Sequence, residues 1–132
     1  MKVGLDTNVL VRYLTQDDPN QAKKANKLMD NYCNKKQSLF INNIVFCELI
    51  WVLERGYKYS KQQIAICIKN LLCSKEFAFE HLDILWVALQ KYDKENMDFS
   101  DALIGELNTT YGCTFTYSFD NKASRSPNFK PL

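Results

Sequence analysis

Four acidic residues that lie far apart in the sequence have the types and spacing to do chemistry together. Asp6 and Asp120 each stand just past a short β-rich stretch, and Glu48 and Asp101 stand near the starts of two apolar helical stretches. Parallel strands end at one edge of a sheet, and that edge is where α/β proteins bind their ligands. We therefore expect the four carboxylates to meet in one pocket.

The chemistry of such a pocket follows from its charge. Clustered carboxylates repel one another unless a cation joins them. Ligands that are all oxygen select hard ions, so the pattern implies Mg²⁺, with Mn²⁺ able to substitute. A metal ion held in this way lowers the pKa of a bound water and stabilises charge on a phosphoryl oxygen. Hydrolysis of a phosphodiester is the reaction that this chemistry favours.

Ordinary structural roles compete with the catalytic one at three of these acids, and Asp101 could simply be a first-turn acid of its helix. Asp6 is well placed to cap the helix that follows it, and Asp98 is better explained as a helix N-cap than as a metal ligand. Glu48 lies among apolar residues, where an unpaired charge is costly to bury, so a salt bridge to Arg12 or Arg55 is its alternative. The alternatives for Asp6 and Glu48 stay open on the sequence.

Other chemistries find little support. His81 is the only histidine, which excludes zinc sites built on histidine pairs, and no GxSxG, P-loop or GxGxxG motif is present. The formal net charge of +2 is too small to indicate nucleic-acid binding by itself. The five cysteines form no CxxC pair and are expected to be reduced thiols. We see no signal sequence or membrane-length apolar run, and therefore expect a cytoplasmic protein with no membrane partner.

The carboxylates must be positioned by alternating strands and helices, which predict an α/β class with a parallel sheet covered on both faces. The 132 residues are expected to form one domain. The stretch 44–55 is apolar almost all round and is expected to be a buried helix, and the residues after Asp120 are expected to be a short polar tail. Strands are expected at 3–5, 38–42, 77–81 and 114–118, and helices from about 7, 20, 44, 61, 83 and 99.

Four segments together resemble the PIN-domain ribonucleases, specifically the toxins of the virulence-associated protein C (VapC) type. Their order and spacing span nearly the whole chain, and the four in order are far more specific than any one alone. The segments are Leu5-Asp-Thr-Asn-Val-Leu10, Phe46-Cys-Glu-Leu-Ile-Trp-Val-Leu53, Asp98-Phe-Ser-Asp-Ala-Leu-Ile104 and Tyr117-Ser-Phe-Asp-Asn-Lys-Ala123.

The resemblance implies a fold and a set of site residues. The fold would be a PIN-like three-layer α/β/α sandwich, a single domain over residues 1–132, with a central, mostly parallel sheet of four or five short strands. Asn8 and Ser118 would support the acidic site by hydrogen bonds to ligands or water, with Ser118 standing where family members often have threonine. The catalytic and metal-binding residues would be Asp6, Glu48, Asp101 and Asp120.

The resemblance also implies an activity and partners. The chain would be a magnesium-dependent endoribonuclease acting on RNA, usually a homodimer, and the toxin of a toxin–antitoxin pair. A cognate VapB-like antitoxin encoded beside it would silence it. Because such antitoxins commonly bind operator DNA, this chain would reach DNA only indirectly.

Two rival functions remain on the sequence. Asp6-Thr-Asn8 is similar to the nucleophile loop of haloacid-dehalogenase-like phosphatases, with Asp6 as nucleophile, but the second acid of that loop is missing and the chain is short for that family. The other rival is a non-catalytic PIN-fold binding module. Intact carboxylates at all four positions argue against it.

Overall fold

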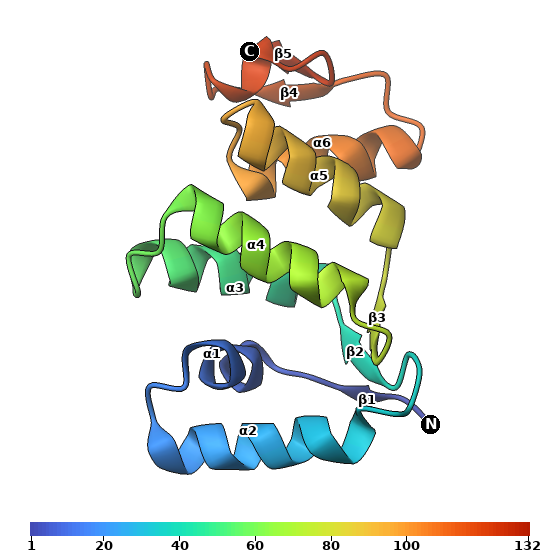
Figure 1. Cartoon of the computed structure of the whole chain (residues 1–132). Coiled ribbons are helices and arrows are strands. Elements are labelled where there is room, and N and C mark those ends of the chain that lie inside the picture. The colour runs from blue at the N-terminus through green and yellow to red at the C-terminus, as the bar shows by residue number, and fades with distance from the viewer. The chain divides into compact units, whose positions relative to one another are not determined.

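The computed structural model describes all 132 residues and divides them into two compact units, Met1–Glu80 and His81–Leu132 (Figure 1). Each unit is described by itself. The first contains a parallel sheet of order β1-β2-β3, in which Val3 pairs with Leu39 and Leu39 with Phe77. Its elements are β1 (Val3–Gly4), α1 (Thr7–Thr15), α2 (Pro19–Tyr32), β2 (Leu39–Ile41), α3 (Asn43–Arg55), α4 (Lys61–Cys73) and β3 (Phe77–Phe79).

Each helix of the first unit begins at a side chain suited to cap it. Asp18 caps α2 with Pro19 as the first helical residue, Asn42 caps α3, and Ser60 with Gln63 forms a capping box on α4. Two helices connect each pair of neighbouring strands. Their apolar faces close over the sheet in a core in which Phe46 and Phe79 meet edge to face at 5.6 Å between ring centroids.

Helix α3 is not buried on all sides, contrary to the expectation from its composition. Its buried face carries Phe46, Leu49 and Leu53, whereas Ile44 is 72% exposed and Trp51 58% exposed. The guanidinium of Arg55 lies 6.0 Å from the Trp51 ring centroid, which gives the exposed ring a cationic neighbour. An all-apolar helix therefore leaves one apolar stripe open at the surface.

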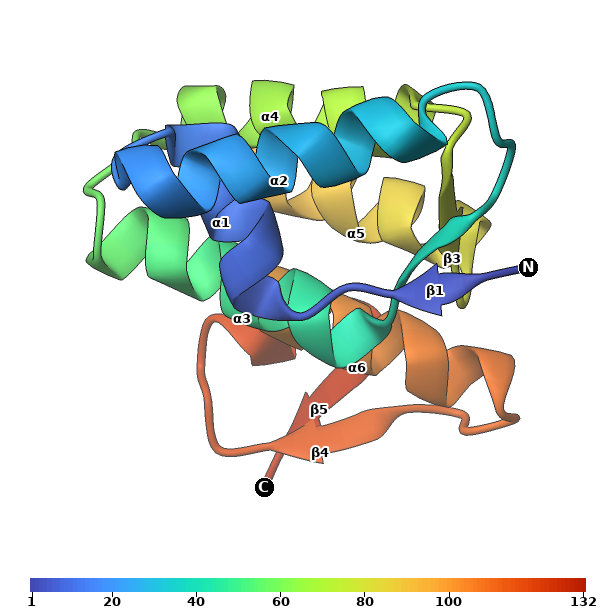
Figure 2. The same ribbon diagram turned by 90° about the horizontal axis from the view of Figure 1, so that it is seen from below.

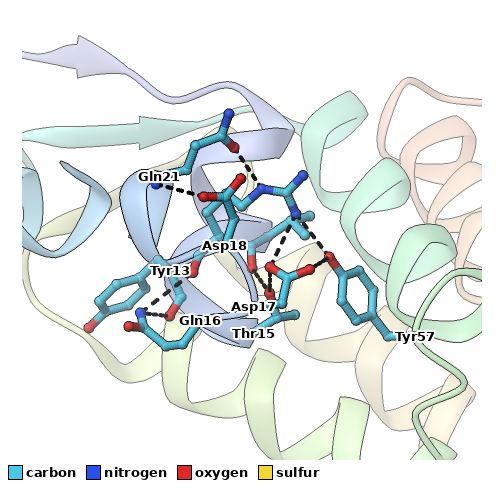
Figure 3. A network of polar contacts seen from close by, with 9 residues as sticks. Tyr13, Thr15, Gln16, Asp17, Asp18, Gln21 and Tyr57 are labelled. Atoms are coloured by element: carbon cyan, nitrogen blue, oxygen red, sulfur yellow. Dashed lines mark hydrogen bonds and ion pairs between the residues drawn. The ribbon is translucent and has the colours of Figure 1, made fainter. Parts of the chain in front are cut away.

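A polar network fixes the turn after α1 to the segment between α3 and α4. The Tyr57 hydroxyl donates a hydrogen bond to Asp17 at 2.5 Å, and Thr15 donates another at 2.8 Å (Figure 3). These two bonds, that of Tyr57 first, hold the pKa of Asp17 below its ordinary value. Arg12 donates to Tyr57, Asp17 and Gln21, so this network holds its guanidinium.

The second unit joins two helices to a small sheet. Helix α5 packs against α6, with Tyr92 and Phe99 edge to face at 6.1 Å. Lys91 of α5 pairs with Glu106 of α6 at 2.7 Å. Strands β4 and β5 run parallel and lie side by side (Figure 2). The elements are α5 (Leu82–Lys94), α6 (Phe99–Thr110), β4 (Thr116–Ser118), the 3₁₀ helix η1 (Ala123–Arg125) and β5 (Phe129–Pro131).

The expected polar tail is instead an ordered part of this unit. Residues Phe129–Pro131 form β5, and the Phe129 ring is buried against α6. A Cβ atom at Gly105 would lie 2.6 Å from Cε1 of Phe129, so the glycine allows the ring to approach the helix backbone. A stretch of three residues that ends in proline is too short to establish a period of two, which is why no strand could be predicted here.

The α/β class and the parallel pairing of strands are confirmed. The arrangement differs from the expectation in one respect, because the five strands are divided between a three-stranded and a two-stranded sheet. The reason is the tail, since β4 finds its partner in β5. No helix combines the length and the hydropathy that crossing a bilayer would require.

Candidate metal centre

Asp6 combines a capping role with an accessible carboxylate. It stands in extended conformation between β1 and α1, and its Oδ1 accepts a hydrogen bond from the Thr7 amide at 2.8 Å. The sequence alternative of capping is thus correct, but it occupies only one oxygen. The side chain is exposed, so its other oxygen, Oδ2, is accessible to a ligand.

Glu48 lies on an open face of α3, not in the apolar interior that its neighbours suggested. Its Oε1 accepts a hydrogen bond from the Thr7 hydroxyl at 2.8 Å. The expected alternative of a salt bridge is wrong, because Arg12 is held by its own network and Arg55 lies over Trp51. Glu48 takes part in none of the ion pairs of the structure.

Thr7 is the residue that sequence reasoning missed. It is buried, its amide holds Asp6, and its hydroxyl holds Glu48, so it brings these two acids together from β1 and α3. The available signal was its position inside the first motif segment, directly after Asp6. Asn8, the next residue, is exposed and makes no side-chain hydrogen bond.

Asp101 stands in the first turn of α6 and is half-buried. Burial raises the pKa of its carboxyl, and the negative charges of Asp98 and Asp120 raise it further. Asp98 is the N-cap of α6, as expected, and its side chain accepts a hydrogen bond from the Asp101 amide at 3.2 Å. Asp101 therefore faces two acidic neighbours, and no ion pair joins it to a cation.

Asp120 follows β4 and is fixed by the loop that it caps. Its Oδ1 accepts hydrogen bonds from the backbone amides of Lys122 at 2.8 Å and Ala123 at 3.1 Å. These bonds orient the carboxylate at the start of η1. Its own amide donates to the Ser118 hydroxyl at 2.9 Å. Ser118 thus supports the loop through the backbone of Asp120.

The structure therefore gathers the predicted acids as two pairs, one in each unit. Asp6 and Glu48 are joined through Thr7, and Asp101 and Asp120 interact through their charges. Within either unit, no group of three or more His, Cys, Asp or Glu side chains could hold a metal ion. Each pair offers oxygen ligands without a cationic partner. Mg²⁺ is commonly bound through one or two carboxylates with water completing its shell, so each pair suits such an ion in type.

Comparisons with known proteins identify the family of this chain. The chain is similar to the VapC ribonuclease of Aquifex aeolicus (strain VF5), with 27% identity over 99 residues, or 75% of this chain and 73% of that protein. No solved structure matches the chain. The family model of the PIN domain matches residues 3–127, a span that contains all four acids and parts of both units. The chain belongs to the PIN-domain family.

Proposed function

We propose that this chain is a magnesium-dependent endoribonuclease and the toxin of a toxin–antitoxin pair. Its catalytic and metal-binding residues would be Asp6, Glu48, Asp101 and Asp120. The observation that carries the proposal is that all four acids lie in the matched span and none is in an ion pair. Similarity to a protein named as a ribonuclease supports the choice of RNA as substrate.

The donor set fits a hard divalent cation, because every side chain in it offers carboxylate oxygen. When bound, Mg²⁺ supplies a water of lowered pKa and stabilises charge on a phosphoryl oxygen. The chain's own residues hold the geometry. Backbone amides fix one oxygen of Asp6 and one of Asp120, and Thr7 fixes one oxygen of Glu48. These acids would orient an attacking water by accepting its hydrogens.

Asp101 has a distinct part in this proposal. Its pKa is raised by burial and by its acidic neighbours, so its ionised form is disfavoured in the metal-free fold. A divalent cation relieves that repulsion, and the relief adds to the free energy of metal binding. Asp101 would thus couple metal binding to the stability of α6.

The chemistry is tested by RNA cleavage in chelator and with added Mg²⁺ or Mn²⁺. Cleavage should vanish in chelator and return with either ion. Asp6→Asn and Asp101→Asn should each reduce it on the order of a hundredfold or more, because each removes a charged ligand. The matched control is Asp98→Asn, which changes the helix cap and removes a charge near Asp101 but removes no proposed metal ligand, and it should cost much less.

Full activity of Asp6→Asn in chelator would overturn the metal-nuclease proposal. Absence of cleavage with any divalent ion, together with no binding of Mg²⁺, would favour a non-catalytic module. Sequencing the cut ends of cellular RNA after brief induction would identify which RNA is cleaved.

The partner is part of the same proposal. We expect an antitoxin to lay a helix or an extended tail over apolar surface and to reach the acidic site with a basic side chain. A groove of about 330 Å³ between α1 and α2 offers such surface, with Val9, Ala25 and Leu28 among its lining residues. The exposed Ile44 and Trp51 of α3 offer more, and a second copy of the chain is the other expected partner.

A further inference from the structure

Strand β4 of the second unit and the residue after it carry exposed aromatic side chains. Tyr117 of β4 is 60% exposed, and Phe119, just beyond the strand, is 80% exposed. The rings of Phe115 and Tyr117 meet edge to face at 5.1 Å. We refer to Phe115, Tyr117, Phe119 and Lys130 together as the aromatic face.

The alternation of a strand explains why the rings of Phe115 and Tyr117 share a side. Side chains at alternate positions point to the same face, so 115 and 117 oppose 116 and 118. Phe119 follows at the bend directly after the strand, where its ring is exposed. Thr116 accepts a hydrogen bond from Asn108 of α6 at 2.9 Å, and its register partner Phe129 is buried. The inner side of the sheet is thus already occupied by α6.

A cation completes the aromatic face. Lys130 is the register partner of Tyr117, and its Nζ lies 4.1 Å from the ring centroid of Phe115. Leaving a phenylalanine exposed forgoes the favourable burial of its ring, so this surface is unfavourable for an isolated chain. A surface that combines open rings with a positive charge suits a ligand that has both flat apolar faces and negative groups.

We propose that the aromatic face binds single-stranded RNA, with a base stacked on Phe119 and a phosphate near Lys130. The inference rests on the proposed nuclease function and assigns its substrate contact. Phe119 immediately precedes Asp120, and neighbouring Cα atoms are about 3.8 Å apart. On this proposal, the stacked base would belong to a nucleotide near the phosphate that is cut. Stacking tolerates every base, so the contact would give affinity and register more than sequence choice.

The test measures binding apart from cleavage. The full-length chain is titrated in EDTA against a fluorescently labelled hexamer of adenosine ribonucleotides and against a hexamer whose riboses carry no bases, and binding is followed by anisotropy. Loss of one stacked base should weaken affinity about tenfold. Phe119→Ala should therefore weaken adenosine-hexamer binding by that factor and leave abasic-hexamer binding unchanged.

Three further variants separate stacking from other effects. Phe119→Leu keeps an apolar side chain but no ring, so it should behave as Phe119→Ala, whereas Phe119→Trp should retain wild-type affinity. Lys130→Gln should weaken binding of both hexamers to the same extent. It should also reduce the slope of log affinity against log salt concentration by about 0.7. Tyr111→Ala is the matched control, because that ring is 75% exposed but lies at the end of α6, off the sheet.

Each outcome decides the matter. Equal affinity of the wild type for both hexamers, or affinity for neither, overturns the proposal. So does a Phe119→Ala change in sedimentation that Phe119→Leu rescues, because that result marks a protein contact. If Phe119→Ala loses affinity only for the adenosine hexamer but the wild type shows no metal-dependent cleavage, the RNA-binding proposal stands and the nuclease proposal fails. If the wild type cleaves RNA with metal but Phe119→Ala binds the adenosine hexamer as tightly as the wild type, the nuclease proposal stands and the RNA-binding proposal fails.

Discussion

Asp101 stands beside Asp98 and Asp120, and the sign of its pKa shift has consequences for stability. A carboxyl whose pKa is higher in the folded state binds protons more readily there than in the unfolded chain. Stability therefore falls as pH rises from the unfolded value near 3.8 through the higher folded value, and the penalty persists above it. Metal-free protein at neutral pH carries that penalty in full.

Asp101→Asn removes the charge and should stabilise the metal-free fold. At pH 7 in chelator we expect a gain of about 0.5 kcal/mol, small because solvent screens a partly open site. Added Mg²⁺ should stabilise the wild type, and it should stabilise the variant much less. Thermal melts of both proteins between pH 3 and pH 7, each with chelator and with Mg²⁺, measure this. A variant that melts well below metal-free wild type would show that Asp101 is a structural residue.

Single-residue roles were readable from the sequence only where they are local. Asp98 as an N-cap depends on a residue three positions away, and Asp6 as a cap depends on its neighbour, so both could be predicted. The pairing of Glu48 could not, because its partner Thr7 is 41 residues distant. Nor could the sequence reveal that Tyr57 and Asp17 had already engaged Arg12.

Helix α6 and strand β5 show an element-scale constraint at Gly105. Glycine costs about 1 kcal/mol in a helix interior relative to alanine, yet here it admits the Phe129 ring. Gly105→Ala should therefore destabilise the fold by about 1–3 kcal/mol despite the better helix former, because its Cβ overlaps Cε1 of Phe129. Urea unfolding measures the change.

The control for this substitution is Gly4→Ala, where a Cβ atom meets nothing within 4 Å. A second variant, Gly105→Ala with Phe129→Leu, should recover part of the loss because the smaller side chain makes room. A rise in stability on Gly105→Ala alone would mean that the ring moves aside at little cost.

Elements with strong local signals were predictable, and those formed by distant pairing were not. The Ser60 and Gln63 capping box and the buried strand before Asn42 follow from neighbouring residues. Strand β5 forms because Phe129 packs on α6 and because its backbone pairs with β4. Neither contact can be predicted from the three residues of the strand. The exposure of Trp51 likewise depends on how the unit packs.

At the scale of the whole molecule, the match to the PIN family extends over both units of the structure. Residues 3–127 include both carboxylate pairs, one from each unit. The motif order predicted this membership from the sequence alone, because the four segments extend along nearly the entire chain. Which surfaces are left open for partners needed the structure.

A partner prediction belongs at this scale. If the chain is a toxin as proposed, it should inhibit growth, co-expression of a small protein encoded beside it should restore that growth, and the two should purify together. Leu28→Asp, in the groove between α1 and α2, should weaken that complex because it charges an apolar lining. Asn31→Asp is the matched control on the exposed face of α2. Recovery of the chain from its own host without a small partner would contradict the prediction.

The fit of Phe129 against Gly105 has a consequence for how this sequence can diverge. The two positions cannot change independently, because a side chain at 105 needs the space that the ring at 129 fills. A homologous chain that acquires alanine or a larger residue at 105 must reduce 129 in compensation, or move its last strand away from α6. Since the same strand pairs with the one that leads to Asp120, selection on the acidic site extends to a glycine that never touches it.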